Sequence, residues 1–241
     1  MSAPRLFVDV KCEPGSQVDL ERGDARHLAT VLRMKPGDEV TVVAERAVWK
    51  AVLADVRGDR AIATILALDV HPSPELPVAV AVLQAIPKGT KMDDVVEKVV
   101  ELGAAAVVPV RCARSYGGDS PSKVERWRRI ARAAAQQSQR LFVPAVEEPV
   151  AFGHALARYA PTMQLIVAHE RAQRGSLAAA LQQREQPLAI VIGPEGSFTD
   201  EELREARDAG SSLASIGPAV LRTETAAAAM LAAIAALRGW W

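Results

Sequence analysis

Cysteine, histidine and aromatic residues are scarce in this chain of 241 residues, and aromatic side chains make up only 4% of it. The 2 cysteines, Cys12 and Cys112, stand alone and far apart, and the 4 histidines show no metal-ligand spacing. A disulfide framework and a zinc site of the common types both need closer groups of such residues. We therefore expect no disulfide and no bound metal.

Long apolar runs and an excess of one charge are also absent. No apolar run approaches the roughly 20 residues that span a membrane, and residues 1–5 lack the basic-then-apolar pattern of a signal peptide. We expect a cytoplasmic protein that does not contact a membrane. With 29 basic and 29 acidic residues the net charge is zero, so only a local cluster of basic residues could indicate a nucleic-acid partner.

The first 70 or so residues have the pattern of a small all-β domain. Short apolar runs alternate with turn sequences, which favours a barrel or a sandwich. The expected strands cover residues 5–9, 39–44, 49–56 and 60–66.

A single helix is expected to interrupt these strands, over residues 24–33, and Asp24 is placed to cap its N-terminus. Three apolar residues at helical spacing should form its buried face: Leu28, Val31 and Leu32. The opposite face is basic, and it suits either simple solvation or contact with a polyanion. It carries Arg26, His27 and Arg33, with Arg5, Arg22 and Lys35 nearby.

Three prolines within residues 71–77 mark a boundary between two domains. Proline blocks both a helix and a central strand, so this segment is expected to be a stiff linker. Beyond it apolar strands alternate with helical stretches, the pattern of an α/β domain with a parallel sheet. We expect a β-rich domain over residues 1–71, a linker over 72–77 and an α/β domain over 78–241.

The α/β domain begins with a strand–helix–strand unit whose helix ends at Gly103. Capping boxes are expected at Ser122 with Glu125 and at Thr199 with Glu202. The expected strands cover residues 78–85, 106–110, 164–168, 188–192 and 213–216, and the expected helices cover 92–102, 122–139, 175–183, 199–209 and 225–237. The last helix is mostly alanine, which packs closely, so we expect it to lie against another helix or a partner subunit.

Two loops of this domain, over residues 192–198 and 216–226, have a related layout. Each follows a short apolar strand, contains Gly-Pro and delivers polar side chains to the start of a helix. Such loops form ligand sites at the carboxyl edge of a parallel sheet. Neither has the G-x-G-x-x-G or G-K-S/T signature of the common nucleotide sites, so a nucleotide-like ligand bound here would need another fold.

Basic residues are concentrated in one part of the chain. Residues 111–140 contain eight basic and two acidic side chains, a net charge of +6, whereas residues 141–241 have a net charge of −3. Arginine can bind phosphate with two parallel hydrogen bonds, so such a face favours a polyanion. The alternative is a solubilising face that pairs with acidic residues elsewhere.

The two loops belong to a set of motifs that extends over nearly the full length of the chain. The earlier motifs are Arg26-His27-Leu28, Val31-Leu32-Arg33, Lys88-Gly89, Met92-Asp93, Glu97-Lys98, Glu101-Leu102-Gly103, Arg126-Trp127, Gln137-Ser138 and Arg140. The most specific are Gly193-Pro194-Glu195-Gly196 and Leu221-Arg222-Thr223-Glu224-Thr225-Ala226. In these motifs the chain resembles the SPOUT class of knotted methyltransferases, and within it the ribosomal RNA small-subunit methyltransferase E family. It departs from that family at Gln139 and Ser197, where the family usually has glycine, which adopts a positive φ more readily.

The resemblance implies a fold and a reaction. The fold is α/β: an N-terminal PUA-like RNA-binding β-barrel, then a SPOUT domain with a parallel sheet and a C-terminal trefoil knot, assembled as a homodimer. The reaction is S-adenosylmethionine-dependent methylation of N3 of a uridine in 16S rRNA, position 1498 in the family's target, with free rRNA or the small ribosomal subunit as substrate. Two alternatives stay open: an RNA-binding ribosome-assembly factor without turnover, which Ser197 alone supports, and a related SPOUT enzyme that modifies tRNA or another rRNA site.

The resemblance also implies site residues. Those expected to bind the cofactor are Ala168, His169, Glu170, Ile192, Gly193, Pro194, Glu195, Gly196, Ile216, Gly217, Val220, Leu221, Arg222 and Thr223. Those expected to bind RNA are Arg5, Arg22, Arg26, His27, Arg33, Lys88, Lys91, Arg114, Arg126, Arg129 and Arg140. The catalytic candidates are Arg222, Glu195 and Glu224. Arg222 would stabilise negative charge on the uracil oxygens, or would instead form a salt bridge to either glutamate that shapes the pocket.

Overall fold

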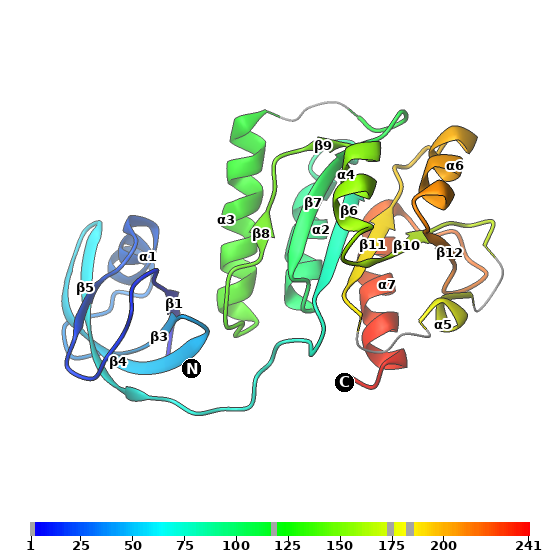
Figure 1. Cartoon of the computed structure of the whole chain (residues 1–241). Helices are drawn as coiled ribbons and strands as arrows, with labels where there is room; N and C mark the ends of the chain where they lie inside the picture. The colour runs from blue at the N-terminus through cyan, green and yellow to red at the C-terminus, as the bar shows by residue number, and fades with distance from the viewer. Residues whose placement is uncertain (1–2, 117–119, 173–175, 182–185) are drawn as a thin grey trace. The chain divides into compact units, whose positions relative to one another are not determined.

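The computed structural model describes residues 3–116, 120–172, 176–181 and 186–241. The chain divides into two compact units (Figure 1). The first contains Met1–Glu75 together with Ala135–Val143, and the second contains Leu76–Ala134 together with Pro144–Trp241. The first crossing between the units therefore falls inside the proline-rich segment. A later segment, Ala135–Val143, also belongs to the first unit, although the sequence pattern placed it in the α/β domain.

The first unit is built on a five-stranded sheet with the order β1-β3-β4-β5-β2. Its strands are β1 (Arg5–Phe7), β2 (Gln17–Asp19), β3 (Glu39–Ala44), β4 (Ala47–Arg57) and β5 (Arg60–Leu68). Only β1 and β3 pair in parallel, and β4 carries two register shifts against β5 that bend the sheet. The predicted strands are confirmed to within three residues at each end, while β2 is too short to show a pattern of its own.

The predicted helix of this unit is wrong in part. A short α1 (Arg22–Arg26) continues into one turn of π-helix, His27–Val31, in which the Leu32 amide donates to the His27 carbonyl. The wider π turn breaks the regular 3.6-residue spacing. Leu28 is buried as predicted, but Val31 and Leu32 are 65% and 43% exposed. Asp24 makes no cap and instead accepts a hydrogen bond from Gln136.

The second unit contains a parallel sheet with the order β12-β10-β11-β6-β7-β8, and β9 pairs with the end of β7. Its strands are β6 (Val80–Ala85), β7 (Ala106–Arg111), β8 (Ala145–Val146), β9 (Val150–Ala151), β10 (Gln164–Ala168), β11 (Leu188–Ile192) and β12 (Ser212–Ala214). Its helices are α2 (Lys91–Glu101), α3 (Pro121–Gln137), α4 (Phe152–Tyr159), α5 (Ser176–Ala180), α6 (Asp200–Asp208) and α7 (Thr223–Leu237), except that the end of α3, from Ala135, belongs to the first unit.

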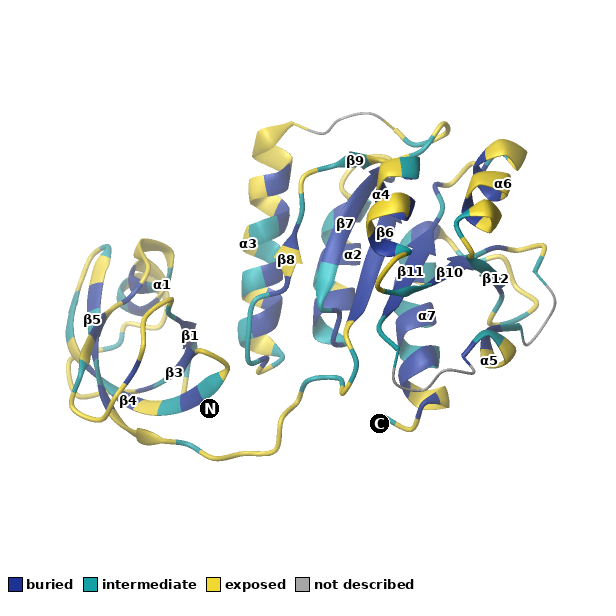
Figure 2. Ribbon diagram, viewed as in Figure 1, coloured by how far each residue is buried: buried dark blue, intermediate teal, exposed yellow. Residues whose placement is uncertain are grey.

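Helices cover both faces of this sheet, which explains why β6 and β11 are buried throughout. The helices α4 and α6 pack together on one face, and α7 packs on α2, β11 and β6 on the other. Figure 2 shows the central strands as buried and the outer faces of the helices as exposed. The predicted parallel α/β architecture is therefore confirmed, as continuous apolar strands require.

In the second unit, the ends of α2 and α6 follow the sequence signals, whereas the start of α3 does not. The helix α2 ends at Gly103 and α6 at Gly210, both with positive φ, and α6 begins with the predicted Thr199–Glu202 capping box. The helix α3 begins at Pro121, so Ser122 lies inside the helix and the predicted capping box there is wrong. Proline fits this first position because its missing N–H would have no helical partner.

Besides β2, three short elements had no prediction, namely β8, β9 and α4. The predicted helix over residues 175–183 is confirmed over Ser176–Ala180, and part of it lies outside the described residues. Within the described ranges no helix is both long enough and apolar enough to cross a membrane.

Candidate active site

A cavity of about 550 Å³ opens at the carboxyl ends of β10, β11 and β12. The loops that follow these three neighbouring strands form its walls, and the start of α7 closes it. Its lining residues are Lys91, Ala168, His169, Glu170, Ile192, Gly193, Pro194, Glu195, Ser197, Phe198, Ala214, Ser215, Ile216, Ala219, Val220, Leu221, Arg222, Thr223, Ala226 and Met230. This is the sheet edge at which parallel α/β folds bind ligands.

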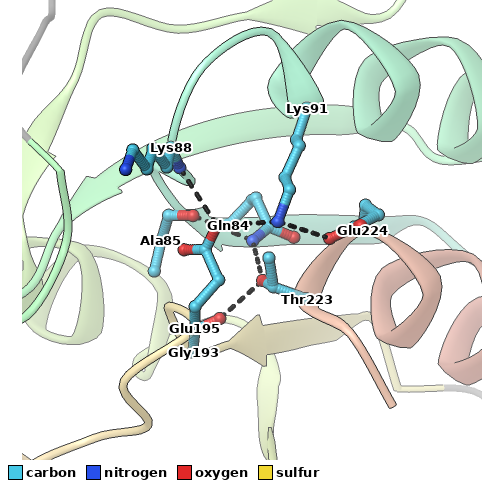
Figure 3. A network of polar contacts seen from close by, with 8 residues as sticks. All are labelled: Gln84, Ala85, Lys88, Lys91, Gly193, Glu195, Thr223 and Glu224. Carbon is cyan, nitrogen blue, oxygen red and sulfur yellow. Dashed lines mark hydrogen bonds and ion pairs between the residues drawn. The ribbon is translucent and has the colours of Figure 1, made fainter.

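A buried polar chain fixes one wall of the cavity (Figure 3). Gln84 is fully buried on the central strand β6, and its Nε2 donates to Thr223 Oγ1 over 2.8 Å. Thr223 Oγ1 in turn donates to the Gly193 carbonyl over 2.6 Å. Because these groups are shielded from water, losing one would leave its neighbour unsatisfied. The first residue of α7 and the loop after β11 are thereby tied to the centre of the sheet.

Gly193 is required by the packing of Phe198 beneath the loop. A Cβ atom added to Gly193 would lie 2.9 Å from the Phe198 ring, closer than such atoms normally approach. That ring is buried and packs against Phe152 with a centroid distance of 5.4 Å. The glycine therefore lets the loop backbone approach a buried aromatic ring closely.

A cluster of charges borders the cavity, with Lys91 at its centre. Lys91 Nζ lies 3.0 Å from Glu195 Oε1 and 3.7 Å from Glu224 Oε2, and the Lys88 amide also donates to Glu195. The hydrogen bond to Glu195 raises the pKa of Lys91 above its ordinary value, against the opposing effect of burial. Burial opposes ionisation of Glu195, but the hydrogen bonds from Lys91 and from backbone amides outweigh it and lower the pKa of this carboxyl.

Arg222 lines the cavity from the N-cap position of α7, and its side chain is exposed. The sequence left open a salt bridge from Arg222 to Glu195 or Glu224. In the described part of the chain the ion pairs of both glutamates are with Lys91 instead. The Arg222 guanidinium is therefore available to a ligand.

Glu170 and Ser197 join two of the walls. Ser197 has a φ of 59°, and its Oγ lies 3.1 and 3.2 Å from the two carboxylate oxygens of Glu170. Next to them His169 is buried, and its Nδ1 accepts a hydrogen bond from the Arg171 amide. The loops after β10 and β11 are thus linked by a side-chain contact at the cavity wall.

Comparison with known proteins assigns the chain to a family. A family described as the RNA methyltransferase domain matches residues 74–235, and one described as the RNA methyltransferase PUA domain matches residues 20–66. Ribosomal RNA small subunit methyltransferase E from Synechocystis sp. is 36% identical over 239 residues, which cover 98% of this chain and 78% of that protein. The chain belongs to the ribosomal RNA small subunit methyltransferase E family.

Further relatives agree with this family over nearly the whole chain. The protein of the same name from Bacillus subtilis is 31% identical over 244 residues, 95% of each chain. The crystal structure of the Neisseria gonorrhoeae protein of that name, bound to S-adenosyl methionine, is 32% identical with a TM-score of 0.87 over 100% of this chain and 98% of that one. A putative methyltransferase from Legionella pneumophila, solved with bound SAM, has a TM-score of 0.88 at 28% identity over 98% of both chains.

The structure brings together most residues predicted for the cofactor of this family. All of them line the cavity except Gly196 and Gly217. Gly196 lies in the same loop and accepts a hydrogen bond from Arg114, while Glu224 adjoins the cavity through Lys91. Sequence reasoning missed Gln84, although a lone glutamine in the apolar strand β6 was a usable signal. The predicted cofactor set also left out eight residues that line the cavity: Lys91, Ser197, Phe198, Ala214, Ser215, Ala219, Ala226 and Met230.

Arg140 was predicted to bind RNA, and the structure contradicts this. Its side chain is only 2% exposed, and its guanidinium binds the Glu75 carboxylate with N–O distances of 2.6 and 2.7 Å. A buried arginine that pairs with a carboxylate is not placed to reach a polyanion. Its pairing with Glu75 instead joins two segments of the first unit.

The other residues predicted for RNA lie on the surface or are paired. Arg26, His27, Arg33, Lys88 and Arg129 are exposed. Arg22 pairs with Asp59, Arg126 with Asp93, and Lys91 with the cavity glutamates. Arg5 donates to the carbonyls of Gln139 and Arg140, and burial lowers its pKa. Exposed pairs such as Arg22–Asp59 contribute little stability and can be exchanged for phosphate contacts.

Proposed function

We propose that this protein transfers the methyl group of S-adenosylmethionine to N3 of a uridine in 16S rRNA. The observation that carries the proposal is the cavity itself, in which Arg222 faces the space enclosed by the three loops. Its volume of about 550 Å³ lies within the range of small-molecule sites, roughly 300–1,000 Å³. Family membership and two similar structures with bound cofactor support the same reaction.

The residues present fit S-adenosylmethionine. Ile192, Ile216 and Leu221 offer apolar surface for a purine, and the Gly193 loop offers backbone groups at close range. The carboxylates of Glu170 and Glu195 suit the hydroxyl and ammonium groups of the cofactor. When bound, the cofactor supplies an electrophilic methyl group.

The remaining chemistry falls to side chains of the protein, which must align the uracil and help to remove its N3 proton. Removal of that proton places negative charge on the uracil oxygens, and Arg222 is available to stabilise it. Glu195 is a weak base because its pKa is lowered, so it is better suited to holding the cofactor than to accepting a proton. That leaves Glu224 as the candidate acceptor.

The reaction is tested with small ribosomal subunits from cells that lack the modification. The wild-type protein should transfer a labelled methyl group to 16S rRNA, and nucleoside analysis should identify 3-methyluridine. Arg222→Gln should lower kcat by about 100-fold or more, as loss of a charge-stabilising donor does in other enzymes. A different modified nucleoside, or no transfer by the wild type, would refute the proposal.

We also propose that the C-terminal part of the chain forms a trefoil knot. The strand order supports this: β12 lies at the sheet edge beyond β10, yet α7, which follows it, packs back on β11, β6 and α2. Stretching the chain from its two ends would tighten a knot. The measured contour length should therefore fall short of that expected for 241 residues, and a full contour length would exclude the knot.

A homodimer is the assembly that we propose, with 16S rRNA or the small subunit as the partner and the cytoplasm as the location. Exposed apolar side chains around α7 support it, among them Val220, Leu237 and Trp241. Light scattering should give twice the mass of 25.7 kDa, and Leu237→Asp should give monomers. A monomeric wild type would exclude the dimer.

The alternative of an RNA-binding factor without turnover has lost its support. It depended on Ser197 being unable to take a glycine-like conformation, and Ser197 has a φ of 59°. The loop therefore keeps the backbone path that glycine would give it.

A further inference from the structure

Ser197 occupies a backbone conformation that is unfavourable for serine. Its φ of 59° lies in the left-handed region, which costs any residue with a Cβ atom more than it costs glycine. The conformation is imposed by its surroundings: the Ser197 amide donates to the Pro194 carbonyl over 3.0 Å, and the next residue, Phe198, is buried. The loop would therefore follow the same path with glycine at this position.

What serine adds is its hydroxyl group, and that group acts on the neighbouring loop. The Oγ lies 3.1 Å from one carboxylate oxygen of Glu170 and 3.2 Å from the other. Two nearly equal distances place the hydroxyl between the oxygens, which restricts rotation of the carboxylate plane. A carboxylate has about four acceptor positions, so most remain open to a ligand.

Glu170 is placed to use those positions on a ligand in the cavity. Its side chain lines the cavity and is 38% exposed. Burial opposes its ionisation, but its own backbone amide, the nearby His169 and the Ser197 hydroxyl together lower the pKa of this carboxyl. Glu170 is therefore an anion that can accept hydrogen bonds over the whole neutral pH range.

We propose that Ser197 is a positioning residue of the cofactor pocket, which orients the Glu170 carboxylate toward the hydrogen-bond donors of S-adenosylmethionine. The inference rests on the proposed function. If residue 197 only shaped the loop, glycine would fit this left-handed position with less strain. The proposal explains the serine by the contribution of its hydroxyl group to cofactor binding. A side chain held in its bound orientation loses less entropy when the ligand arrives.

The test is Ser197→Gly, because it should move stability and binding in opposite directions. Removing the Cβ from a left-handed position should raise the urea midpoint of unfolding. Removing the hydroxyl should weaken cofactor binding in calorimetry by about 10-fold, the equivalent of one oriented hydrogen bond. The KM for the cofactor should rise likewise, with kcat within about 3-fold of the wild type.

Gln139→Gly is the matched control. Gln139 is exposed and has a φ of 58°, but it lies in the first unit, and it is not among the residues that line the cavity. This variant should gain stability in the same way and bind the cofactor as the wild type does. Ser197→Asn should restore binding, because asparagine tolerates the left-handed region and its amide can donate to Glu170.

A double-mutant cycle shows whether Ser197 acts through Glu170. In a Glu170→Gln background, Ser197→Gly should cause little further loss of affinity. The inference is overturned if Ser197→Gly binds the cofactor as tightly as the wild type, or if its loss is the same in both backgrounds. A wild type that binds no cofactor would refute the proposed function and this inference together, whereas unchanged binding by the variant would refute only the inference.

Discussion

At the scale of single residues, the charge cluster around Lys91 shows how the cavity holds ionised groups. Lys91 lies between Glu195 and Glu224, and the pKa values of Lys91 and Glu195 shift apart, upward and downward. Each shift favours the charged form of its group. Lys91 is thus the counter-ion of the acidic wall, whereas the sequence suggested a contact to RNA.

Lys91→Met should raise the pKa of Glu195 toward its ordinary value of 4.5, because the hydrogen-bonding cation is lost. NMR titration of the labelled carboxyl measures this directly. Lys98→Met is the control, since Lys98 pairs with Glu97 and Glu101 on the same helix; it should leave Glu195 unchanged. An unaltered Glu195 titration in Lys91→Met would show that backbone donors alone hold the pKa down.

The lowered pKa of Glu195 predicts in which direction the stability of the fold changes with pH. The folded-state pKa of Glu195 lies below its unfolded value of about 4.5. Its pairing therefore stabilises the fold above that pH, and the contribution disappears as the pH falls through the folded-state pKa. In Lys91→Met the loss of stability on acidification should be smaller than in the wild type.

Gly193→Ala should destabilise the protein by about 1–3 kcal/mol, the usual cost of overpacking a well-filled site. The added methyl group would meet the buried Phe198 ring at 2.9 Å. Gly217→Ala is the matched control in the neighbouring loop, because no atom lies within 4 Å of its added Cβ. Urea unfolding should show a change below about 1 kcal/mol for the control, and equal effects of the two variants would contradict the packing argument.

At the scale of elements, one type of helix ending recurs along the chain. After α2, α3, α6 and α7 a residue with positive φ follows the helix, and the amide after it reaches back five residues to a carbonyl. This is the Schellman arrangement, which favours glycine at the turn. Three of the four positions are glycine, at residues 103, 210 and 239, and the fourth is Gln139.

Gln139→Gly should stabilise the protein by about 0.5–1 kcal/mol, because it relieves the left-handed strain but gives the unfolded chain more freedom. Gly210→Ala is the reverse experiment at an equivalent position, with a φ of +81° and open space around the added Cβ. It should destabilise by about 1 kcal/mol. Urea unfolding of both variants tests the pair, and the explanation fails if both change stability in the same direction.

At the scale of the whole molecule, the chain passes between its two units more than once. The first unit is therefore made of two stretches of chain, and a buried ion pair joins them. Glu75 ends the first stretch of the first unit, and Arg140 lies in its second stretch, Ala135–Val143. Glu75 accepts from the Arg140 guanidinium and from the Leu141 amide. The pair thus unites two segments that are far apart in sequence.

Arg140→Leu should destabilise the protein by about 3 kcal/mol or more, because it leaves the Glu75 charge buried without its partner. The double variant Glu75→Leu with Arg140→Leu should recover much of that loss, since two apolar side chains can replace a buried pair. Urea unfolding of the single and double variants measures the coupling. Additive losses would show that the pair itself is unimportant.

The sequence by itself determined the elements whose signals are local. The apolar strands β10 and β11, the Thr199 cap and the glycine after α2 follow from a few adjacent residues, so each was predicted correctly. The positions of the two Gly-Pro loops also followed, because parallel strands bring their carboxyl ends to one edge of a sheet. That edge is where the cavity lies.

Only the tertiary structure decided which side chains meet. It paired Lys91 with Glu195, buried Arg140 against Glu75, and linked Gln84 to Thr223 across 139 positions of the chain. Such contacts depend on the path of the whole backbone, and no pattern of neighbouring residues encodes them. The same holds for Val31, which one π turn exposed to solvent. Local patterns specify elements, whereas long-range packing assigns each polar side chain its partner and so its role.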